Sequence, residues 1–266
     1  MFLDVAHGRL GRPVRILVHV NTNQYYISSQ MAVDTQDIAD FYGTPLGGLA
    51  ASVLRRELSG LWPDVTGMSV LGIGYAVPFF ELWQRGGLCI GLSPSHMGGA
   101  RWPGAQLNLT CTAETEFLPF ADLSFDRVLL IHGLEQAENV RRTLREAWRV
   151  LKDDGRLIVV LPNRRGVWAY AESTPFGHGQ PYSEGQLSRL LTSLFFKVER
   201  QKTALYMPPV NPKLMFRLVW LTERCGPFMA PHFAGLVIAE ASKALYGMMP
   251  SGKRASARRV FVADDA

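Results

Sequence analysis

Between residues 68 and 161, short apolar runs alternate with longer stretches that carry a single apolar stripe. The runs expected to form strands are 68–71, 88–92, 107–111, 127–131 and 156–161. Short, nearly continuous apolar runs are typical of parallel strands that are covered on both faces. Stretches 77–84 and 136–151 are expected to be crossover helices. This spacing predicts an α/β fold with a parallel sheet and right-handed crossovers.

Two more helices are predicted ahead of the first strand, within residues 31–63. Asp34 is suited to cap the first of them, and the second is expected over 49–61, with its leucines on one stripe. Pro45 and Gly47-Gly48 are expected to break the helical pattern between the two. Helices in this position can cover the sheet or close over a pocket.

The two ends of the 266-residue chain differ from its centre. Residues 1–30 mix Arg, Gly and Pro, and their apolar and polar residues alternate only weakly. This pattern predicts a segment outside the core. This segment is either an extended or disordered arm or the product of an upstream start codon. One domain is expected over 31–245, followed by a tail over 246–266. Basic residues at both ends account for most of the net charge of +5. The nearly neutral centre argues against a dedicated nucleic-acid binder.

The three cysteines, Cys89, Cys111 and Cys225, lie far apart and outside any C-x-x-C spacing, so no metal site is expected. No apolar run reaches the roughly 18 residues that a membrane-spanning helix needs. The N-terminus also lacks the basic and apolar regions of a signal sequence. These features predict a cytoplasmic location.

The first strand runs into a turn that contains Gly72 and Gly74, followed by Tyr75. Glycine tolerates positive φ and lets a backbone approach a ligand closely, and a helix N-terminus offers unpaired N–H groups. Many α/β proteins hold a nucleotide-like ligand in this way, at the carboxyl edge of the sheet. The alternative is a tight strand-to-helix turn without a ligand.

Four segments together resemble the class I S-adenosylmethionine-dependent methyltransferases, in particular their type 11, small-molecule branch. The segments are Leu71–Ala76, Glu114–Phe120, Ser124–Glu135 and Glu146–Leu157. The resemblance implies a Rossmann-like, seven-stranded, mostly parallel sheet with helices on both faces and an antiparallel last strand. Its sixth and seventh strands would fall near 195–205 and 235–241. Between them, 207–232 would be a helical insertion. Its apolar part, 213–228, either packs into the core, lines the substrate pocket or binds a protein partner.

The resemblance implies S-adenosyl-L-methionine as cofactor, with catalysis resting mainly on alignment of an acceptor with the methyl group. The residues implied to bind the cofactor are Gly72, Gly74, Tyr75, Ser93, Ser95, Glu114, Thr115 and His132. Glu114 would accept a hydrogen bond from the adenine amino group; the alternative is an exposed loop acid. Ser93-Pro94-Ser95 lies where the family usually has a carboxylate that forms hydrogen bonds with both ribose hydroxyls. Replacing charged hydrogen bonds by neutral ones weakens binding roughly ten- to a few-hundredfold. The missing acid also argues against a dinucleotide dehydrogenase.

The candidate groups on the acceptor side are His132, Glu135, His178 and Tyr182. His132 has a suitable pKa for a general base, although a structural histidine is the alternative. The turn 163–166 could hold an anionic substrate or be a solvated loop.

Two functions follow from these residues. The first is an S-adenosylmethionine-dependent methyltransferase acting on a small molecule. The second is a methyltransferase-like protein with weak or no catalysis that binds a partner through 213–228. An RNA or protein methyltransferase is less favoured, because the chain lacks the Asn/Asp-Pro-Pro-Tyr signature after the fourth strand.

Overall fold

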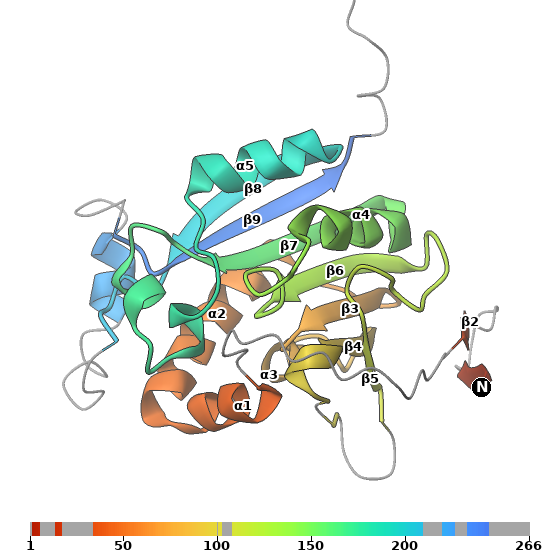
Figure 1. The fold of residues 1–266 in the computed structure, drawn as a ribbon, viewed down its shortest axis with the longest axis horizontal. Coiled ribbons are helices and arrows are strands. Elements are labelled where there is room, and N and C mark those ends of the chain that lie inside the picture. The colour runs from red at the N-terminus through yellow and green to blue at the C-terminus, as the bar shows by residue number, and fades with distance from the viewer. Residues whose placement is uncertain are drawn as a thin grey trace, which may run out of the picture.

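A computed structural model describes residues 34–99, 101–102, 108–209, 220–226 and 233–244, together with the backbone of 2–5 and 14–17. Its centre is a seven-stranded sheet (Figure 1). The strands are β3 (Ser69–Gly74), β4 (Leu88–Pro94), β5 (Thr110–Ala113), β6 (Phe125–Ile131), β7 (Leu151–Pro162), β8 (Phe196–Ala204) and β9 (Leu236–Lys243). Their order is β5-β4-β3-β6-β7-β9-β8. β9 is antiparallel to both of its neighbours and the other pairs are parallel, which confirms the predicted topology.

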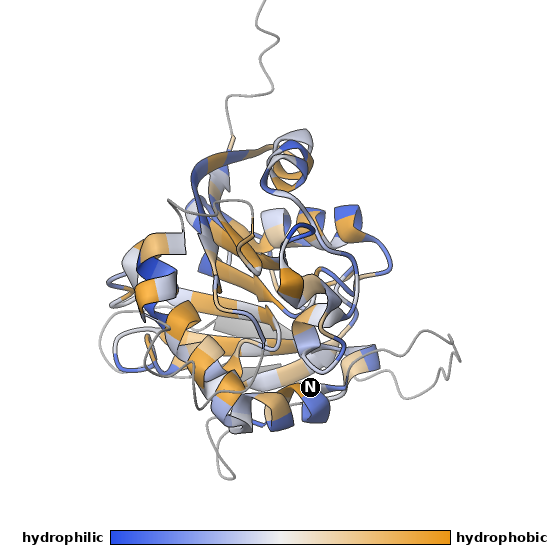
Figure 2. Ribbon diagram, turned by 90° about the vertical axis from the view of Figure 1, so that its left-hand side faces the viewer, coloured by the Kyte–Doolittle hydropathy of each residue, from blue (hydrophilic) through white to orange (hydrophobic). Residues whose placement is uncertain are grey.

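Helices cover both faces of the sheet. They are α1 (Thr35–Gly43), α2 (Pro45–Leu61), α3 (Val77–Phe80), α4 (Val140–Val150) and α5 (Glu184–Ser193), with short 3-10 turns η1 (Ser95–Met97), η2 (Val167–Tyr170) and η3 (Pro175–Gly177). One hydrophobic core joins α2 and α3 to the sheet, and another joins α4 and α5 to the opposite face. Figure 2 shows hydrophobic residues concentrated in the central strands. None of the helices within the described ranges is long and apolar enough to cross a bilayer.

The first two helices meet at Thr44, which ends α1 and caps α2. Its hydroxyl accepts a hydrogen bond from the backbone N–H of Gly47 at 3.0 Å, and Pro45 takes the first helical position, where its missing N–H costs nothing. The expectation that Gly47-Gly48 breaks the helix was wrong, because both glycines lie inside α2. A Cβ on Gly47 would lie 1.9 Å from the carbonyl oxygen of Phe41. Glycine is therefore required for the close turn between the two helices.

Several element boundaries also differ from the sequence-based expectation. The helix expected over 77–84 is the single turn α3, after which the chain continues as turns. The helix expected from residue 136 begins only at Val140, because Asn139 caps it by accepting from the backbone N–H of Arg142 at 3.1 Å. The turn expected at 153–155 belongs to strand β7.

The structure describes only short parts of the two chain ends, so it does not test the predicted domain boundaries. β1 (Phe2–Val5) and β2 (Val14–Leu17) pair with each other in a separate antiparallel sheet. The predicted tail over 246–266 lies outside the described residues. Of the predicted insertion, residues 207–209 and 220–226 are described, and the latter are helical. The boundaries at 30 and 245 stay predictions.

Asp126 in β6 links this strand to β3 and β7 at the edge of the sheet where the three strands begin. Its carboxylate accepts hydrogen bonds from the backbone N–H and hydroxyl of Ser69 in β3, at 2.9 and 2.8 Å, and from Nζ of Lys152 in β7, at 2.8 Å. Burial alone would raise the pKa of Asp126, but these hydrogen bonds outweigh it and hold the pKa below its usual value.

We expect Asp126→Asn to lower the free energy of unfolding by about 1–2 kcal/mol at pH 7. The pKa of Asp126 is lower in the folded protein than in the unfolded chain. Its stabilising effect is therefore complete above about pH 4 and is lost as the pH falls through the folded pKa. Urea unfolding from pH 7 to pH 3 should show the two proteins converging. Asp154→Asn, at an exposed position, is the control and should change stability by less than about 0.5 kcal/mol. A gap that stays constant down to pH 3 would contradict this role.

Candidate active site at the carboxyl edge of the sheet

The glycine turn after β3 packs closely against the protein's own backbone. Gly74 has φ of 92°, and a Cβ there would lie 2.1 Å from the carbonyl oxygen of Ile131. A Cβ on Gly72 would lie 2.4 Å from the Cβ of Ala76. The N–H of Tyr75 also donates to the oxygen of Ile131 at 2.9 Å. The two glycines therefore allow β3 to approach β6 and α3, and α3 is too short to give the strong dipole expected of a full helix.

A group of buried polar side chains follows β6 at the same edge. His132 is fully buried and has φ of 55°. Its Nε2 lies 2.7 Å from the hydroxyl of Tyr42, and its Nδ1 lies 3.6 Å from Oε1 of Glu135, which is also buried. Within the described residues, Nδ1 of His132, Oε2 of Glu135 and both amide atoms of Gln136 are buried without a hydrogen-bond partner. Such atoms are rare in folded proteins, and a cluster of them marks a place where a polar ligand could be accommodated.

Tyr42 belongs to this group, although no sequence pattern distinguished it from other apolar positions of α1. Burial raises the pKa of its hydroxyl well above the usual value, and the negative charge of Glu135 adds to the effect. The hydroxyl therefore stays protonated at neutral pH. It can donate to His132 or accept from it, depending on the tautomer of the imidazole.

Helix α1 covers His132 through the side chain of Tyr42. The ring of Tyr42 stacks on Tyr75 with centroids 6.1 Å apart, and Ile38 forms a buried cluster with Tyr75 and Met97. From the other side, Phe176 lies with its ring centroid 4.6 Å from that of His132. The protein's own side chains thus fill the space around His132.

The neighbouring ends of β4 and β5 bring two other predicted residues together. The hydroxyl of Ser95 donates to the carboxylate of Glu114, and both residues are exposed. Ser93 is buried in the strand. The hydroxyl of Thr115 is also buried and lies 3.1 Å from that of Thr143 in α4. Glu114 and Ser95 therefore form the accessible half of the predicted cofactor site.

The loop that carries His178 docks on the polar group through its backbone. The N–H of Gln180 donates to the carbonyl oxygen of Glu135 at 2.8 Å. The ring of His178, in contrast, hydrogen-bonds to the carbonyl of Glu172 at 2.9 Å. Tyr182 is half-buried, and its pKa is raised by burial and then by the charge of Glu135. The charge of Glu135 therefore acts on Tyr182, whereas the ring of His178 is bound to the carbonyl of Glu172.

The turn after β7 has a structural role at Asn163. Its buried amide donates to the carbonyl of Ala234 at 2.8 Å and accepts from the N–H of Arg165 at 3.2 Å. Arg164 and Arg165 are exposed, as the solvated-loop alternative predicts. Within the described residues, no three His, Cys, Asp or Glu side chains gather as metal ligands would. Burial raises the pKa of Cys89 to about 12 and that of Cys111 to about 11, which keeps both thiols protonated.

Comparison with known proteins gives a family for the central part of the chain. Residues 70–159 match the family described as "Methyltransferase domain". The chain is 38% identical to demethylmenaquinone methyltransferase of Corynebacterium efficiens over 134 residues, which cover 49% of this chain and 57% of the relative. It is 33% identical to the uncharacterized protein YafS of Escherichia coli over 115 residues, covering 43% of this chain and 44% of that one. The chain spans less than two thirds of the length of the curated relatives it matches.

A solved structure shares the fold. It is an S-adenosylmethionine-dependent methyltransferase from Thermotoga maritima, described as a possible histamine N-methyltransferase. It superposes with a TM-score of 0.53 at 19% identity, over 78% of this chain and 95% of that protein. The sheet order described above and the matched segment agree. Residues 70–159 of this chain are therefore similar in sequence to the methyltransferase family, and the sheet has the fold of an S-adenosylmethionine-dependent methyltransferase.

Proposed function

We propose that the chain is an S-adenosyl-L-methionine-dependent methyltransferase that acts on a small-molecule acceptor, in the cytoplasm and without a nucleic-acid partner. The observation that carries the proposal is the buried polar group of His132 and Glu135. It lies beside the glycine turn, at the carboxyl edge of a methyltransferase-family sheet. Ligands of open α/β sheets bind outside this edge.

With α1 moved away from His132, the residues present would suit the two ends of such a cofactor. The unpartnered Oε2 of Glu135 would accept from the ammonium group of the amino-acid portion, near the backbone of Gly74 and Tyr75. Glu114 and Ser95 would bind the adenosine portion, where Glu114 is exposed and would exchange its hydrogen bond with Ser95 for one with the adenine amino group. When bound, the cofactor supplies an electrophilic methyl group on a positively charged sulfur.

On the acceptor side, His132 is proposed to take up a proton where the acceptor carries one. The Tyr42 hydroxyl holds one ring nitrogen by a hydrogen bond, and Glu135, 3.6 Å from the other nitrogen, would stabilise the protonated ring by its charge. His178 is proposed as a further acceptor-side group in a loop that docks on Glu135.

Calorimetry with S-adenosylhomocysteine tests the proposal. We expect binding to the full chain and a loss of about ten- to a hundredfold in affinity for Glu114→Gln, because a hydrogen bond to a charged group is replaced by a neutral one. Glu116→Gln, which changes an acid of the same loop that pairs with Arg142, should bind as the unchanged chain does. Equal affinity of Glu114→Gln and the unchanged chain would contradict the adenine role of Glu114.

A second candidate function is that of a methyltransferase-like protein with weak or no catalysis that binds a partner through 213–228. Two observations favour it: no carboxylate follows β4, and Tyr42 and Tyr75 fill the edge near His132. In the described part of the insertion, Trp220 and Leu221 are exposed. Tyr42→Ala separates the candidates, because it removes the side chain that covers His132. Absence of heat with both the unchanged chain and Tyr42→Ala, at millimolar ligand, would favour the second candidate and remove the first.

A further inference from the structure

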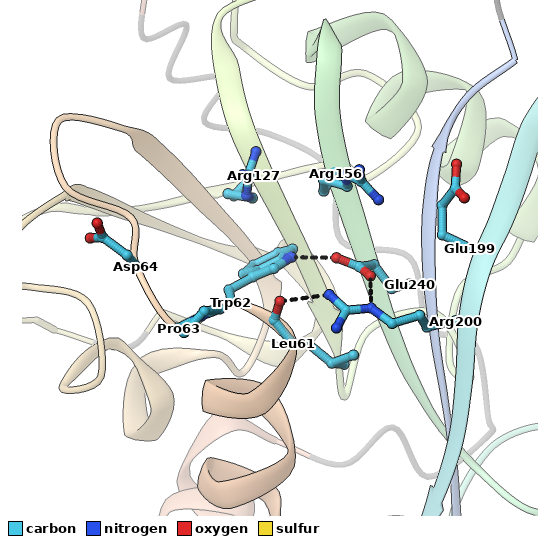
Figure 3. Close-up of a pocket in the computed structure, with 9 residues that line it drawn as sticks. All are labelled: Leu61, Trp62, Pro63, Asp64, Arg127, Arg156, Glu199, Arg200 and Glu240. Carbon is cyan, nitrogen blue, oxygen red and sulfur yellow. Dashed lines mark hydrogen bonds and ion pairs between the residues drawn. The ribbon is translucent and has the colours of Figure 1, made fainter.

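A pocket of about 440 Å³ lies at the opposite edge of the sheet, where β6 and β7 begin (Figure 3). Trp62, which follows α2, lines it together with Arg127 and Arg156. Arg127 stands near the start of β6, whereas His132 follows the end of the same strand. The pocket is therefore separate from the proposed methyl-transfer site.

Two arginines of this pocket stand side by side on one face of the sheet. Arg127 and Arg156 are directly paired in the parallel register of β6 and β7. Paired residues of neighbouring parallel strands point to the same face, with strands about 4.8 Å apart. Figure 3 shows both side chains on adjacent strands. The two positive charges repel each other: burial lowers the pKa of Arg127, and the charge of Arg156 lowers it further, against the opposing effect of nearby acids.

Most donors of these two guanidinium groups have no acceptor. Nη1 of Arg127 donates to the backbone oxygen of Asp126 at 2.8 Å, but its Nε is buried without a partner. The side chain of Arg156, which lines the pocket, forms no hydrogen bond or ion pair within the described part of the chain, although its charge acts on Glu199. A guanidinium presents five donors in a planar fork, which suits the paired oxygens of an oxyanion.

The acids around the pocket are already engaged with other donors. Glu240 accepts from Nε1 of Trp62 at 3.1 Å and from Nε of Arg200 at 2.6 Å. Glu199 accepts from Ser242 and Lys197, and Asp64 accepts from the N–H and hydroxyl of Thr66. Asp126 is paired with Lys152, and Asp154 is exposed. The charges of Asp126 and Glu240 offset part of the charge of Arg127, and Glu199 interacts with Arg156. Within the described residues, however, none of these carboxylates accepts a hydrogen bond from the side chain of Arg127 or Arg156, so most guanidinium donors stay open to an anion.

We propose that this pocket binds a phosphate group, held by Arg127 and Arg156. A dianion matches two guanidinium charges better than a monoanion does, and arginine pairs are suited to bidentate contact with phosphate oxygens. The pocket is larger than a phosphate ion alone, so it admits either free phosphate or the phosphate end of a small phosphorylated molecule.

The test is calorimetry of the full chain at constant ionic strength, with inorganic phosphate, glycerol phosphate and acetate as three separate ligands. We expect both phosphates to bind and acetate to bind at least about tenfold more weakly. Arg156→Gln should weaken phosphate binding by about tenfold or more. Arg145→Gln, which changes an exposed arginine of α4, should leave binding unchanged. Tighter binding of glycerol phosphate identifies an ester as the ligand, and equal binding identifies free phosphate.

Three results would overturn the proposal: no binding of either phosphate at about 10 mM, equal affinity of Arg156→Gln and the unchanged chain, or acetate bound as tightly as phosphate. A thermal melt of Arg156→Gln without phosphate shows whether the variant is folded. Arg156→Lys retains the charge without the planar fork, so it should recover part of the binding even if the glutamine variant is unstable. The outcome is independent of S-adenosylhomocysteine binding at the other edge.

Discussion

Replacing Gly74 with alanine is expected to lower the free energy of unfolding by about 3 kcal/mol or more. At φ of 92°, an L side chain is strained whatever the space around it. Here the space is also taken, because the new Cβ would lie 2.1 Å from the oxygen of Ile131 and 2.8 Å from the nitrogen of Gly133. Both atoms belong to the backbone between β6 and the turn that carries His132. The variant can fold only if β3 and β6 separate at the carboxyl edge.

Gly48→Ala is the matched control for this substitution. Gly48 lies inside α2, and nothing lies within 4 Å of the Cβ that alanine would add. Alanine in a helix interior is favoured over glycine by about 0.5–1 kcal/mol, so this variant should be slightly more stable than the unchanged chain. Urea unfolding of both variants measures the difference. A Gly74→Ala protein within 1 kcal/mol of the unchanged chain would mean that the approach of β3 to β6 is not as close as described.

Arg200→Met is expected to cost about 2–3 kcal/mol of stability, because it leaves the carboxylate of Glu240 buried without a counter-charge. Glu240 is 1% exposed and lies 2.6 Å from Nε of Arg200, which also donates through Nη2 to the carbonyl of Leu61 at 2.8 Å. The estimate is below the value for a fully buried pair, because the Arg200 side chain is about half exposed.

The double variant Arg200→Met/Glu240→Gln separates the charge from the packing. Glutamine keeps an oxygen that can accept from Nε1 of Trp62, now 3.1 Å from Glu240, but carries no charge. We expect it to recover more than half of the stability that Arg200→Met loses, since a buried neutral amide costs less than an unpaired carboxylate. Chemical unfolding of the two single variants and the double variant gives the coupling energy. If the double variant is less stable than Arg200→Met, the loss does not come from the buried charge.

The positions of most strands follow from local patterns in the sequence, whereas their order in the sheet comes from the structure. Continuous apolar runs such as 128–131 and 157–161 are typical of strands covered on both faces, and the structure places them in β6 and β7. The turn chemistry was less predictable. Gly47 looks like a helix breaker, but the requirement for a small residue comes from the backbone of Phe41. That contact depends on how two helices meet.

The sequence allows contacts in the candidate site to be predicted where both residues directly follow neighbouring parallel strands. Ser95 and Glu114 follow neighbouring strands, so their contact follows from sheet order. The bond between Tyr42 and His132 could not be foreseen, because it joins residues 90 positions apart through the docking of α1. The pairing of Arg127 with Arg156 likewise depends on register, which charge patterns do not reveal.

The hydroxyl of Tyr42 and the ring of Tyr75 give the proposed site a closed ground state. If the proposed cofactor binds beside His132, α1 must first move away from it. The apparent dissociation constant would then exceed the intrinsic one by the inverse of the fraction of chains in which α1 has moved. If one chain in a hundred is open, the binding free energy measured in an equilibrium titration is about 2.7 kcal/mol weaker than the intrinsic one. Association would then be limited by the opening step and would stop rising with ligand concentration, as expected for conformational selection.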